Sequence, residues 1–349
     1  ASGARILVQH KPAGLAVLIT PWNYPAAMGT RKLAPALAAG CGAIVKPASE
    51  TPLTMLALMP LLEEAGVPPG LVNVLPSRRN GELVDHLLHD PRVRVVSFTG
   101  STGVGRTLLR SAADQVLKPA MELGGNAPLI VFEDADLDQA VQGAMLAKMR
   151  NLGEACTAAN RFYVHERVAA AFIAKFVAAM GAMTMGNGLD PSVQVGPLVN
   201  AQTRDTVAAL VDDAVAHGAQ VELGGTRPNG KGFFYPPTVL SHVPETAACV
   251  RAEIFGPVAA IQTFAEESEV IRRANDTEYG LVAYVFTRDM ARGLRICEAL
   301  DFGMVGLNRG LVSDPAAPFG GVKQSGLGRE GGHEGLLEFL ETQYISVDW

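Results

Sequence analysis

Strand-like and helix-like patterns alternate along the first third of the chain. The strand patterns lie at 15–20, 43–46, 71–75 and 93–98, and the helical patterns lie at 27–39, 52–65, 80–88 and 101–112. Strands that are joined through helices run parallel, in a sheet that is covered by helices. The alternation therefore predicts an α/β domain built on a doubly wound parallel sheet. Ligands of such a sheet bind at the carboxyl ends of its strands.

The length of the chain predicts a second domain, because 349 residues exceed one ordinary hydrophobic core. A second alternation has strands at 128–132 and 162–165 and helices at 137–149, 167–181, 201–217, 268–275 and 288–300. We expect a first domain at 1–124, a second α/β domain at 125–317, and a return of 318–349 to the first domain. Residues 343–347 read as a strand that pairs with 5–10 or with another subunit, which makes 1–11 a candidate oligomerisation strand.

Composition excludes several classes of protein. A net charge of −6 and a pI near 5.7 argue against a nucleic-acid binder. No apolar run approaches the ~20 residues that span a bilayer, so we expect no membrane partner. The four cysteines form neither a CxxC motif nor a Cys/His cluster, which argues against a metal site or a disulfide framework. A reducing cytoplasm is the expected compartment.

Three polar residues are candidates for chemistry, although each also has an ordinary structural interpretation. Cys156 ends the turn Asn151-Leu152-Gly153-Glu154-Ala155-Cys156, where a cysteine is either an exposed nucleophile or a small buried hydrophobe. Asn23 is either a turn residue or an amide donor. Glu122 follows an apolar stretch, so it is either a general base with a raised pKa or a linker residue.

Two features at predicted strand ends suit an anionic ligand. The run Gly100-Ser101-Thr102-Gly103-Val104-Gly105 follows a strand and opens a helix, where amide N–H groups and the helix dipole attract phosphate. Its spacing is GxxGxG and departs from the dinucleotide fingerprint GxGxxG, so a tight turn with an N-cap is an equal alternative. Lys46 directly follows a buried strand and reaches either solvent or an anion.

Six short motifs occur in a fixed order around Cys156. They are Pro21-Trp22-Asn23-Tyr24-Pro25, Lys46-Pro47-Ala48-Ser49-Glu50-Thr51-Pro52, Phe98-Thr99-Gly100-Ser101, Glu122-Leu123-Gly124-Gly125, Glu253-Ile254-Phe255-Gly256-Pro257 and Pro318-Phe319-Gly320-Gly321. Together they resemble the aldehyde dehydrogenase superfamily from about residue 12 to the C-terminus. The resemblance implies a Rossmann-like cofactor domain with an α/β catalytic domain. Family members carry a substantial segment before the first motif, so we expect an N-terminally truncated chain.

The resemblance implies a role for each candidate. Cys156 is the nucleophile, Asn23 an oxyanion donor and Glu122 the base for thioester hydrolysis. The implied cofactor-binding residues are Thr20, Pro21, Trp22, Lys46, Ser49, Gly100, Ser101, Gly105, Leu123, Gly124, Glu253 and Phe255. Enzymes of the family that favour NAD usually carry a glutamate where this chain has Ser49. A neutral hydroxyl beside Lys46 accommodates a 2′-phosphate, so we expect NADP to be preferred, with NAD as the alternative.

Within the superfamily, the likeness to succinate-semialdehyde dehydrogenases suggests the substrate. It is carried by Thr30-Arg31-Lys32, Arg150-Asn151 and Leu311-Val312-Ser313. The resemblance implies that Arg31, Arg150 and Ser313 hold the distal carboxylate of a small aldehyde, which suits the fork of arginine. Either arginine could instead pair with an acidic residue of the protein.

Several alternatives stay open. The same arginines would serve glutarate semialdehyde, 2-oxoglutarate semialdehyde or a sulfonated aldehyde. The chain could also be a non-catalytic fragment or structural relative. A thiol hydrolase is disfavoured, since no histidine stands where a cysteine hydrolase needs one. As assembly partners we expect further copies of the same chain, in a homodimer or homotetramer.

Overall fold

A computed structural model describes residues 3–348, which form two compact units. The first unit comprises 3–123, 313–320 and 326–348, and the second comprises 124–312 and 321–325. The chain thus leaves the second unit near Ser313, a few residues before the boundary that we expected, and re-enters it briefly at 321–325. Within residues 3–348, no helix combines the length and hydropathy that crossing a membrane requires.

The first unit is built on a six-stranded sheet in the order β14-β6-β5-β2-β3-β4. Its strands are β2 (Leu15–Ile19), β3 (Ala43–Lys46), β4 (Val72–Val74), β5 (Val93–Thr99), β6 (Lys118–Glu122) and β14 (Gly326–Leu327). Its helices are α1 (Pro25–Ala38), α2 (Pro52–Glu64), α3 (Asn80–Leu88), α4 (Thr102–Ala113) and α11 (Gly332–Leu337). Only β14 runs antiparallel to its neighbour, so the predicted parallel α/β sheet is confirmed. Strand β6 was not predicted, because a lysine, a proline and a glutamate interrupt its short apolar run.

Each face of this sheet has its own hydrophobic core. Along β2, Ala16 and Leu18 pack into a cluster with residues of α1 and α2, while Val17 and Ile19 pack into a cluster with residues of α3 and α4. Burying one such aliphatic side chain contributes about 1.5–3 kcal/mol. The two-residue period of β2 therefore explains why helices cover both faces.

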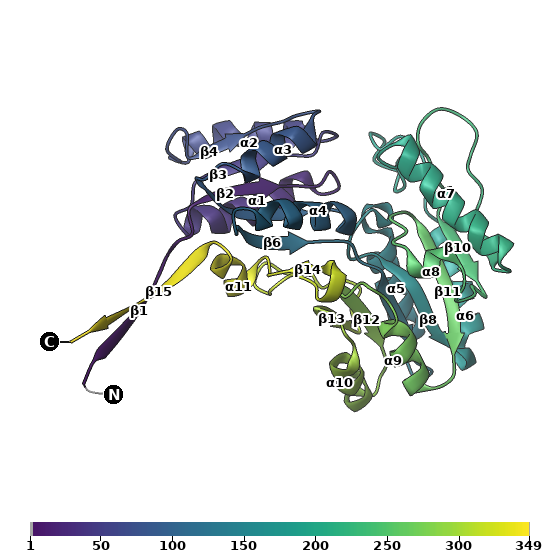
Figure 1. Ribbon diagram of the computed structural model, residues 1–349. Coiled ribbons are helices and arrows are strands. Elements are labelled where there is room, and N and C mark those ends of the chain that lie inside the picture. The colour runs from purple at the N-terminus through teal and green to yellow at the C-terminus, as the bar shows by residue number, and fades with distance from the viewer. Residues whose placement is uncertain (1–2, 349) are drawn as a thin grey trace. The chain divides into compact units, whose positions relative to one another are not determined.

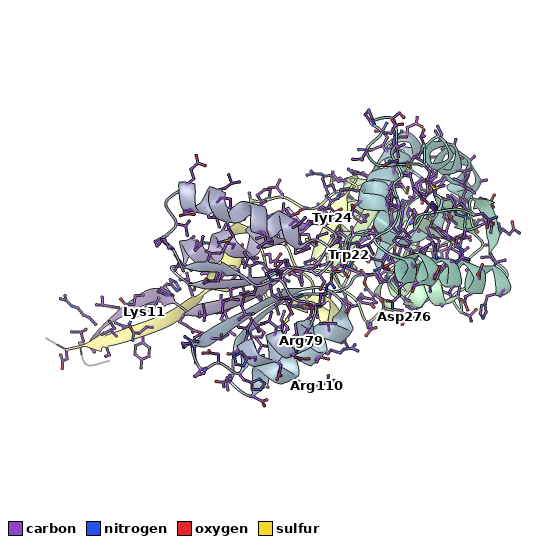
Figure 2. The ribbon with its side chains drawn as sticks, turned by 90° about the horizontal axis from the view of Figure 1, so that it is seen from above. Lys11, Trp22, Tyr24, Arg79, Arg110 and Asp276 are labelled. Carbon is purple, nitrogen blue, oxygen red and sulfur yellow. The ribbon has the colours of Figure 1, made fainter. Side chains whose placement is uncertain are left out.

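A separate two-stranded ribbon joins the beginning and the end of the described chain. Strand β1 (Arg5–Pro12) pairs antiparallel with β15 (Leu340–Val347) over its full length. The strands lie side by side as a thin arm in Figure 1, with the side chains, including that of Lys11, drawn in Figure 2. The ribbon exposes apolar residues, with Ile6 65% and Tyr344 70% accessible. The expected pairing of 343–347 with 5–10 is thus present within one chain.

The second unit contains a seven-stranded sheet in the order β13-β12-β7-β8-β11-β10-β9. Its strands are β7 (Ala127–Val131), β8 (Ala159–His165), β9 (Gln220–Leu223), β10 (Thr238–Ser241), β11 (Val258–Phe264), β12 (Val282–Phe286) and β13 (Met304–Leu307). Its helices are α5 (Leu137–Met149), η1 (Arg150–Gly153), α6 (Glu166–Gly181), α7 (Ala201–Ala216), α8 (Ala248–Arg251), α9 (Glu267–Asn275), α10 (Met290–Ala299) and η2 (Lys323–Ser325). Only β9 is antiparallel to its neighbour. Five of these strands, β9 to β13, were not predicted.

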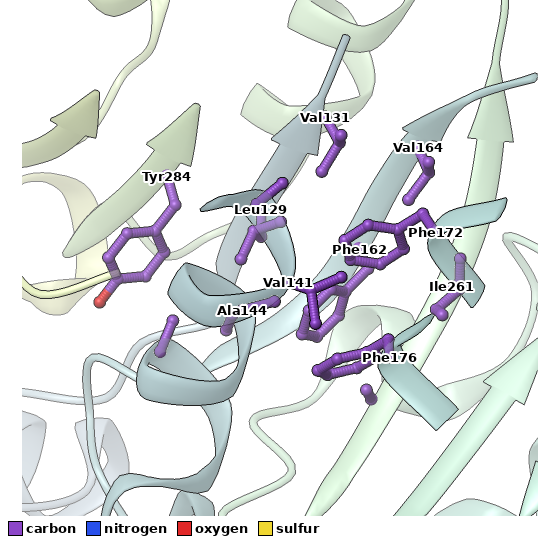
Figure 3. Packing of buried hydrophobic residues seen from close by; sticks show 14 of the residues in the cluster. Leu129, Val131, Val141, Ala144, Phe162, Val164, Phe172, Phe176, Ile261 and Tyr284 are labelled. Carbon is purple, nitrogen blue, oxygen red and sulfur yellow. The ribbon is translucent and has the colours of Figure 1, made fainter. Parts of the chain in front are cut away.

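Aromatic side chains fill the core between this sheet and its helices. Phe162 of β8 packs against Phe176 of α6 with ring centroids 5.4 Å apart, and Phe172 stacks on Phe176 at 5.5 Å (Figure 3). Leu129 and Val131 of β7 belong to the same cluster. Aromatic pairs at these distances contribute about 0.5–1.5 kcal/mol beyond their buried area. This core packs β7 and β8 against α6.

The two edges of the second sheet differ in character. Gly125, Cys156 and Glu253 lie on the segments that enter the parallel strands β7, β8 and β11, so they share the amino edge. At the opposite, carboxyl edge, Asp134 accepts a hydrogen bond from Thr287 at 2.8 Å and pairs with Arg292 at 3.1 Å. The rule that ligands bind at carboxyl ends thus describes the motifs of the first unit but not those of the second.

Candidate active site

Cys156 lies in a tightly constrained turn of the second unit. The turn follows η1, in which Asn151, Leu152 and Gly153 have φ values of 51°, 57° and 74°. A Cβ on Gly153 would collide with the carbonyl oxygen of Gly256, so both the positive φ and the close approach require glycine. The side chain of Asn151 donates to the carbonyl of Glu154 at 3.0 Å. Cys156, at the end of this turn, is partly exposed.

Gly125 connects Cys156 with Glu253. Its N–H donates to Oε1 of Glu253 at 3.1 Å, and a Cβ in its place would collide with the carbonyl oxygen of Cys156. Three motifs that are far apart in the sequence therefore meet at one edge of the second sheet. Phe255, one of the predicted cofactor-binding residues, lies two residues after Glu253 and has a φ of 53°. Gly124 accepts a hydrogen bond from Ser325 at 2.7 Å.

A buried lysine accompanies Glu253. Lys148 has 0% exposure, and its Nζ donates to Oδ1 of Asn160 at 2.8 Å and to the carbonyl of Gly256 at 3.4 Å. Burial lowers the pKa of Lys148 to about 7, against the opposing effect of Glu253. Burial likewise raises the pKa of Glu253 to about 7, opposed by the Gly125 N–H and by Lys148. Lys148 was not predicted from the sequence, because a lysine near the end of a helix that also carries other polar residues resembles a solvent-facing residue.

Glu154, two residues before Cys156, is a second residue that was not predicted. Its Oε1 accepts a hydrogen bond from the backbone N–H of Val199 at 3.0 Å, which ties the cysteine turn to the segment before α7. Burial raises the pKa of Glu154 to about 7.

Glu122 ends β6 in the first unit. The residue is 3% exposed, and within residues 3–348 neither carboxyl oxygen has a hydrogen-bond partner. Burial raises the pKa of Glu122 well above its ordinary value, and the carboxylate of Glu330 raises it further. Lys32, Arg329 and Arg31 oppose this rise. The raised pKa follows from the position of Glu122 after an apolar stretch, and its role as a general base stays a prediction.

Lys32 and Glu330 form an ion pair that was not predicted either. Lys32 lies on α1 and is 1% exposed. Its Nζ contacts Oε1 of Glu330 at 2.5 Å and Oγ of Ser97 at 2.9 Å. Main-chain hydrogen bonds between Glu330 and Phe319, at 2.6 and 2.7 Å, hold the backbone of the acidic partner. No sequence signal marks this pair, since Lys32 stands beside Arg31 in what looks like an ordinary basic helix surface.

Arg31 and Ser313, both predicted to hold the substrate, contact each other in the first unit. Nη2 of Arg31 donates to Oγ of Ser313 at 3.0 Å, and its guanidinium lies 4.5 Å from the ring centroid of Phe319. All three line a pocket of about 450 Å³ between α1 and the segment 313–319. Arg150, the third predicted substrate residue, is partly buried at the start of η1 in the second unit.

The predicted cofactor-binding residues of the first unit gather at the carboxyl edge of its sheet. Thr20, Pro21 and Trp22 follow β2 and lead to Asn23, which is partly buried before α1. Figure 2 labels Trp22 and Tyr24 of the same segment. Gly100 and Ser101 follow β5, and the Gly100 N–H donates to the carbonyl of Glu122 at 3.0 Å.

The N-terminus of α4 fits a phosphate group. The side chain of Ser101, at the N-cap, makes no capping hydrogen bond to α4. A Cβ on Gly105, in the first turn, would collide with Leu123, so this glycine lets the helix pack closely on the end of β6. The exposed amide groups of a helix N-terminus attract phosphate oxygens.

Lys46 and Ser49 define the neighbouring part of the carboxyl edge. Lys46 ends β3 and is buried, and this burial lowers its pKa against the opposing effect of Glu50. Ser49 donates to the carbonyl of Ser77 at 3.0 Å and accepts from Asn80 at 3.0 Å, at the start of α3. Position 49 thus carries a neutral hydroxyl, and the carboxylate of Glu50 follows it. A helix N-terminus and a nearby lysine at the carboxyl edge of a parallel sheet suit the phosphates of a dinucleotide.

Comparison with known proteins agrees with the expected resemblance. Residues 1–345 match the aldehyde dehydrogenase family. The chain is 58% identical over 343 residues to the succinate-semialdehyde dehydrogenase of Paenarthrobacter nicotinovorans, covering 98% of this chain and 76% of that protein. It is 48% identical to the glutarate-semialdehyde dehydrogenase of Pseudomonas putida, covering 98% of this chain and 71% of that protein.

A solved structure also matches. The crystal structure of an NADP-dependent enzyme of Escherichia coli superimposes with a TM-score of 0.98 at 46% identity, covering 100% of this chain and 72% of that one. The predicted fold and family are thereby confirmed: the chain belongs to the aldehyde dehydrogenase family.

Proposed function

We propose that this chain oxidises a short aldehyde bearing a distal carboxylate, with succinate semialdehyde as the first candidate. The observation that carries the proposal is the pocket in which Arg31 and Ser313 meet, because a guanidinium beside a hydroxyl suits a carboxylate. The names of the Paenarthrobacter and Pseudomonas relatives, which refer to succinate and glutarate semialdehydes, support the same substrate class.

Cys156 is the proposed nucleophile. Its thiolate attacks the aldehyde carbon and forms a thiohemiacetal, and loss of hydride from that carbon leaves a thioester on the sulfur. The nicotinamide cofactor supplies the hydride acceptor when bound. Asn23, through its side-chain amide, and Cys156, through its backbone N–H, are the proposed oxyanion donors. Removing one such donor typically slows a reaction about 100-fold or more.

Glu122 is the proposed base for hydrolysis of the thioester. It takes a proton from a water molecule, which attacks the thioester carbonyl, releases the carboxylic acid and restores the thiolate of Cys156. Its burial and raised pKa support this role, because a carboxylate with a raised pKa accepts a proton more readily. The buried ion pair of Lys32 and Glu330 lies in the same unit and acts on the same carboxyl.

We propose that NADP is the preferred cofactor and that NAD is an alternative. The support is the neutral hydroxyl of Ser49, three residues after the buried Lys46 in the sequence, since a carboxylate at position 49 would repel a 2′-phosphate. The matching Escherichia coli structure is described as NADP-dependent. Glu253, held by Gly125, is the proposed partner of the nicotinamide ribose.

Glutarate semialdehyde is the second candidate, because a relative of that name is 48% identical. A panel of aldehydes tests both, with succinate, glutarate and 2-oxoglutarate semialdehydes, a sulfonated aldehyde, and butanal as an uncharged control. We expect kcat/KM for a charged member to exceed that for butanal, and Arg150→Ala to raise KM for the charged substrate about 10-fold or more while leaving butanal little changed. Equal kcat/KM values for charged and uncharged aldehydes would refute this substrate class.

We also propose that the chain assembles with copies of itself, as a homodimer or homotetramer, in the cytoplasm. The exposed apolar side chains on the ribbon of β1 and β15 support assembly, because burying apolar surface against another chain is favourable in free energy. A thiol nucleophile has to stay reduced, which supports a reducing compartment. Sedimentation of the purified protein tests the assembly: we expect a larger mass than one chain, and Ile6→Lys should lower that mass.

A further inference from the structure

Lys148 brings a positive charge into the interior of the second unit. It is the second-last residue of α5 and has 0% exposure. Its Nζ donates to Oδ1 of Asn160 at 2.8 Å and to the carbonyl oxygen of Gly256 at 3.4 Å, and both acceptors are neutral. A buried ammonium group is costly unless a negative charge lies near it. Burial disfavours the charge of Lys148, and the group that favours this charge most is Glu253.

The hydrogen bonds of Lys148 place it beside the segment that carries Glu253. Gly256 lies three residues after Glu253, so the contact with its carbonyl brings the ammonium group to this segment. The carboxylate of Glu253 is itself fixed by the N–H of Gly125 at 3.1 Å. The ammonium group and the carboxylate therefore belong to one cluster at the amino edge of the second sheet, and each favours the charged form of the other.

Of these two charged residues, only Glu253 is accessible to a ligand. Glu253 is partly exposed, whereas Lys148 is fully enclosed. Among residues 3–348, the other titratable group that acts on Lys148 is Cys249 of α8, and Asp213 of α7 acts in turn on Cys249. Burial raises the pKa of Cys249 to about 11, so its thiol stays neutral at neutral pH. Lys148 can therefore influence a bound cofactor through the carboxylate of Glu253.

We propose that Lys148 is a positioning residue for cofactor binding: its charge keeps Glu253 ionised, so that the carboxylate can accept a hydrogen bond from a ribose hydroxyl. This inference rests on the proposed function, in which Glu253 is the partner of the nicotinamide ribose. Hydrogen bonds to a charged acceptor are roughly twice as strong as those between neutral groups. Burial raises the pKa of Glu253 to about 7, and the Gly125 N–H and Lys148 oppose this rise. Without the charge of Lys148, Glu253 would bind a proton at neutral pH and would hold the ribose more weakly.

The first test replaces Lys148 with methionine and measures the Kd of NADP by isothermal titration calorimetry. In the variant, Glu253 should take up its proton at a higher pH than in the wild-type protein. We expect the Kd of the variant to be about fivefold higher than that of the wild type at about pH 7, and to match it at about pH 9, where Glu253 is ionised in both. The ratio of the two Kd values at each pH removes the titration of the phosphate of NADP itself. Lys175→Met, an exposed charge loss on α6, is the matched control and should leave this ratio at one.

The second test leaves the lysine in place and replaces Asn160 with alanine. Loss of the oxygen that accepts from Nζ makes the charged form of Lys148 less stable, so Glu253 loses part of the positive charge that keeps it ionised. We expect the same pH-dependent rise in the Kd of NADP, with a smaller ratio to the wild type. A lysine that only packs α5 against its surroundings would give a ratio that does not change with pH. This variant decides the question if Lys148→Met does not fold.

Glu253→Gln separates this inference from the proposed function. We expect the Kd of NADP to rise about 10-fold in this variant, and adding Lys148→Met to it should change the Kd no further. If Glu253→Gln binds NADP more weakly but Lys148→Met gives the same ratio at every pH, the inference is wrong and the ribose contact stands. If Glu253→Gln binds NADP as tightly as the wild type, the ribose contact is wrong and the inference falls with it.

Discussion

The carbonyl oxygen of Cys156 occupies the space where a side chain on Gly125 would begin. Both residues lie on segments that enter neighbouring parallel strands, β8 and β7. The turn that carries Cys156 therefore packs directly against the backbone of Gly125, and a methyl group at position 125 would displace it.

Gly125→Ala should displace this turn. Because the obstructing atom belongs to the backbone, we expect kcat to fall about 10-fold or more and stability to fall by about 1–3 kcal/mol. Steady-state kinetics and thermal unfolding measure the two effects. Gly188→Ala is the matched control, since nothing lies within 4 Å of a Cβ at that position, and it should change neither. Normal turnover in Gly125→Ala would show that the turn relaxes without consequence.

Cys156→Ala should abolish aldehyde oxidation, with a loss of at least about 1,000-fold in kcat, because no thioester can form. Cofactor reduction followed by absorbance measures the loss. Brief treatment with iodoacetamide should modify Cys156 before Cys41 and Cys249, which are buried. Cys297→Ser is the control, and it should retain activity. Substantial oxidation by Cys156→Ala would place the nucleophile elsewhere.

Glu122→Gln should separate the two halves of the reaction. Hydride transfer should still occur once, and thioester hydrolysis should stop, so rapid mixing should show one burst of reduced cofactor per site and almost no further turnover. In the wild-type enzyme the base acts only when ionised. Since burial raises the pKa of Glu122, kcat should rise with pH well above the range in which an exposed glutamate titrates. A flat profile across that range, or sustained turnover by the variant, would contradict the assignment.

Ser49→Glu should reverse the cofactor preference. A carboxylate in place of the hydroxyl repels a 2′-phosphate, so kcat/KM for NADP should fall about 10-fold or more, while the value for NAD stays similar or rises. Thr54→Glu, which adds the same charge at an exposed position of α2, should leave the ratio unchanged. An unchanged ratio in Ser49→Glu would show that the 2′-phosphate binds elsewhere.

Periodic patterns predicted the helices better than the strands of the second unit. The predicted helices at 80–88 and 137–149 coincide with α3 and α5. Strand β12 was missed because a fully buried strand shows a continuous apolar run with no alternation, and nothing in such a run fixes its secondary structure. Strand β6 was missed for the opposite reason: Lys118 and Glu122, at its two ends, give it a polar appearance.

The sequence predicted functional roles only for residues that belong to one of the recognised motifs. Arg31 and Ser313, 282 positions apart, were expected to act together, and they share a hydrogen bond; their role as substrate ligands stays a prediction. Lys32, Glu330 and Lys148 were not foreseen. The role of a charged residue can be judged only once its burial is known. The burial of these three residues depends on which other segments of the chain pack against them.

The polar edge of the second sheet, where Asp134 joins Thr287 and Arg292, has a practical consequence. It lies across the full length of the strands from the segments that carry Cys156 and Glu253. A dye, a tether to a surface or a short inserted peptide attached there should leave turnover intact. We expect the same attachment near Gly125 or Gly256 to reduce turnover.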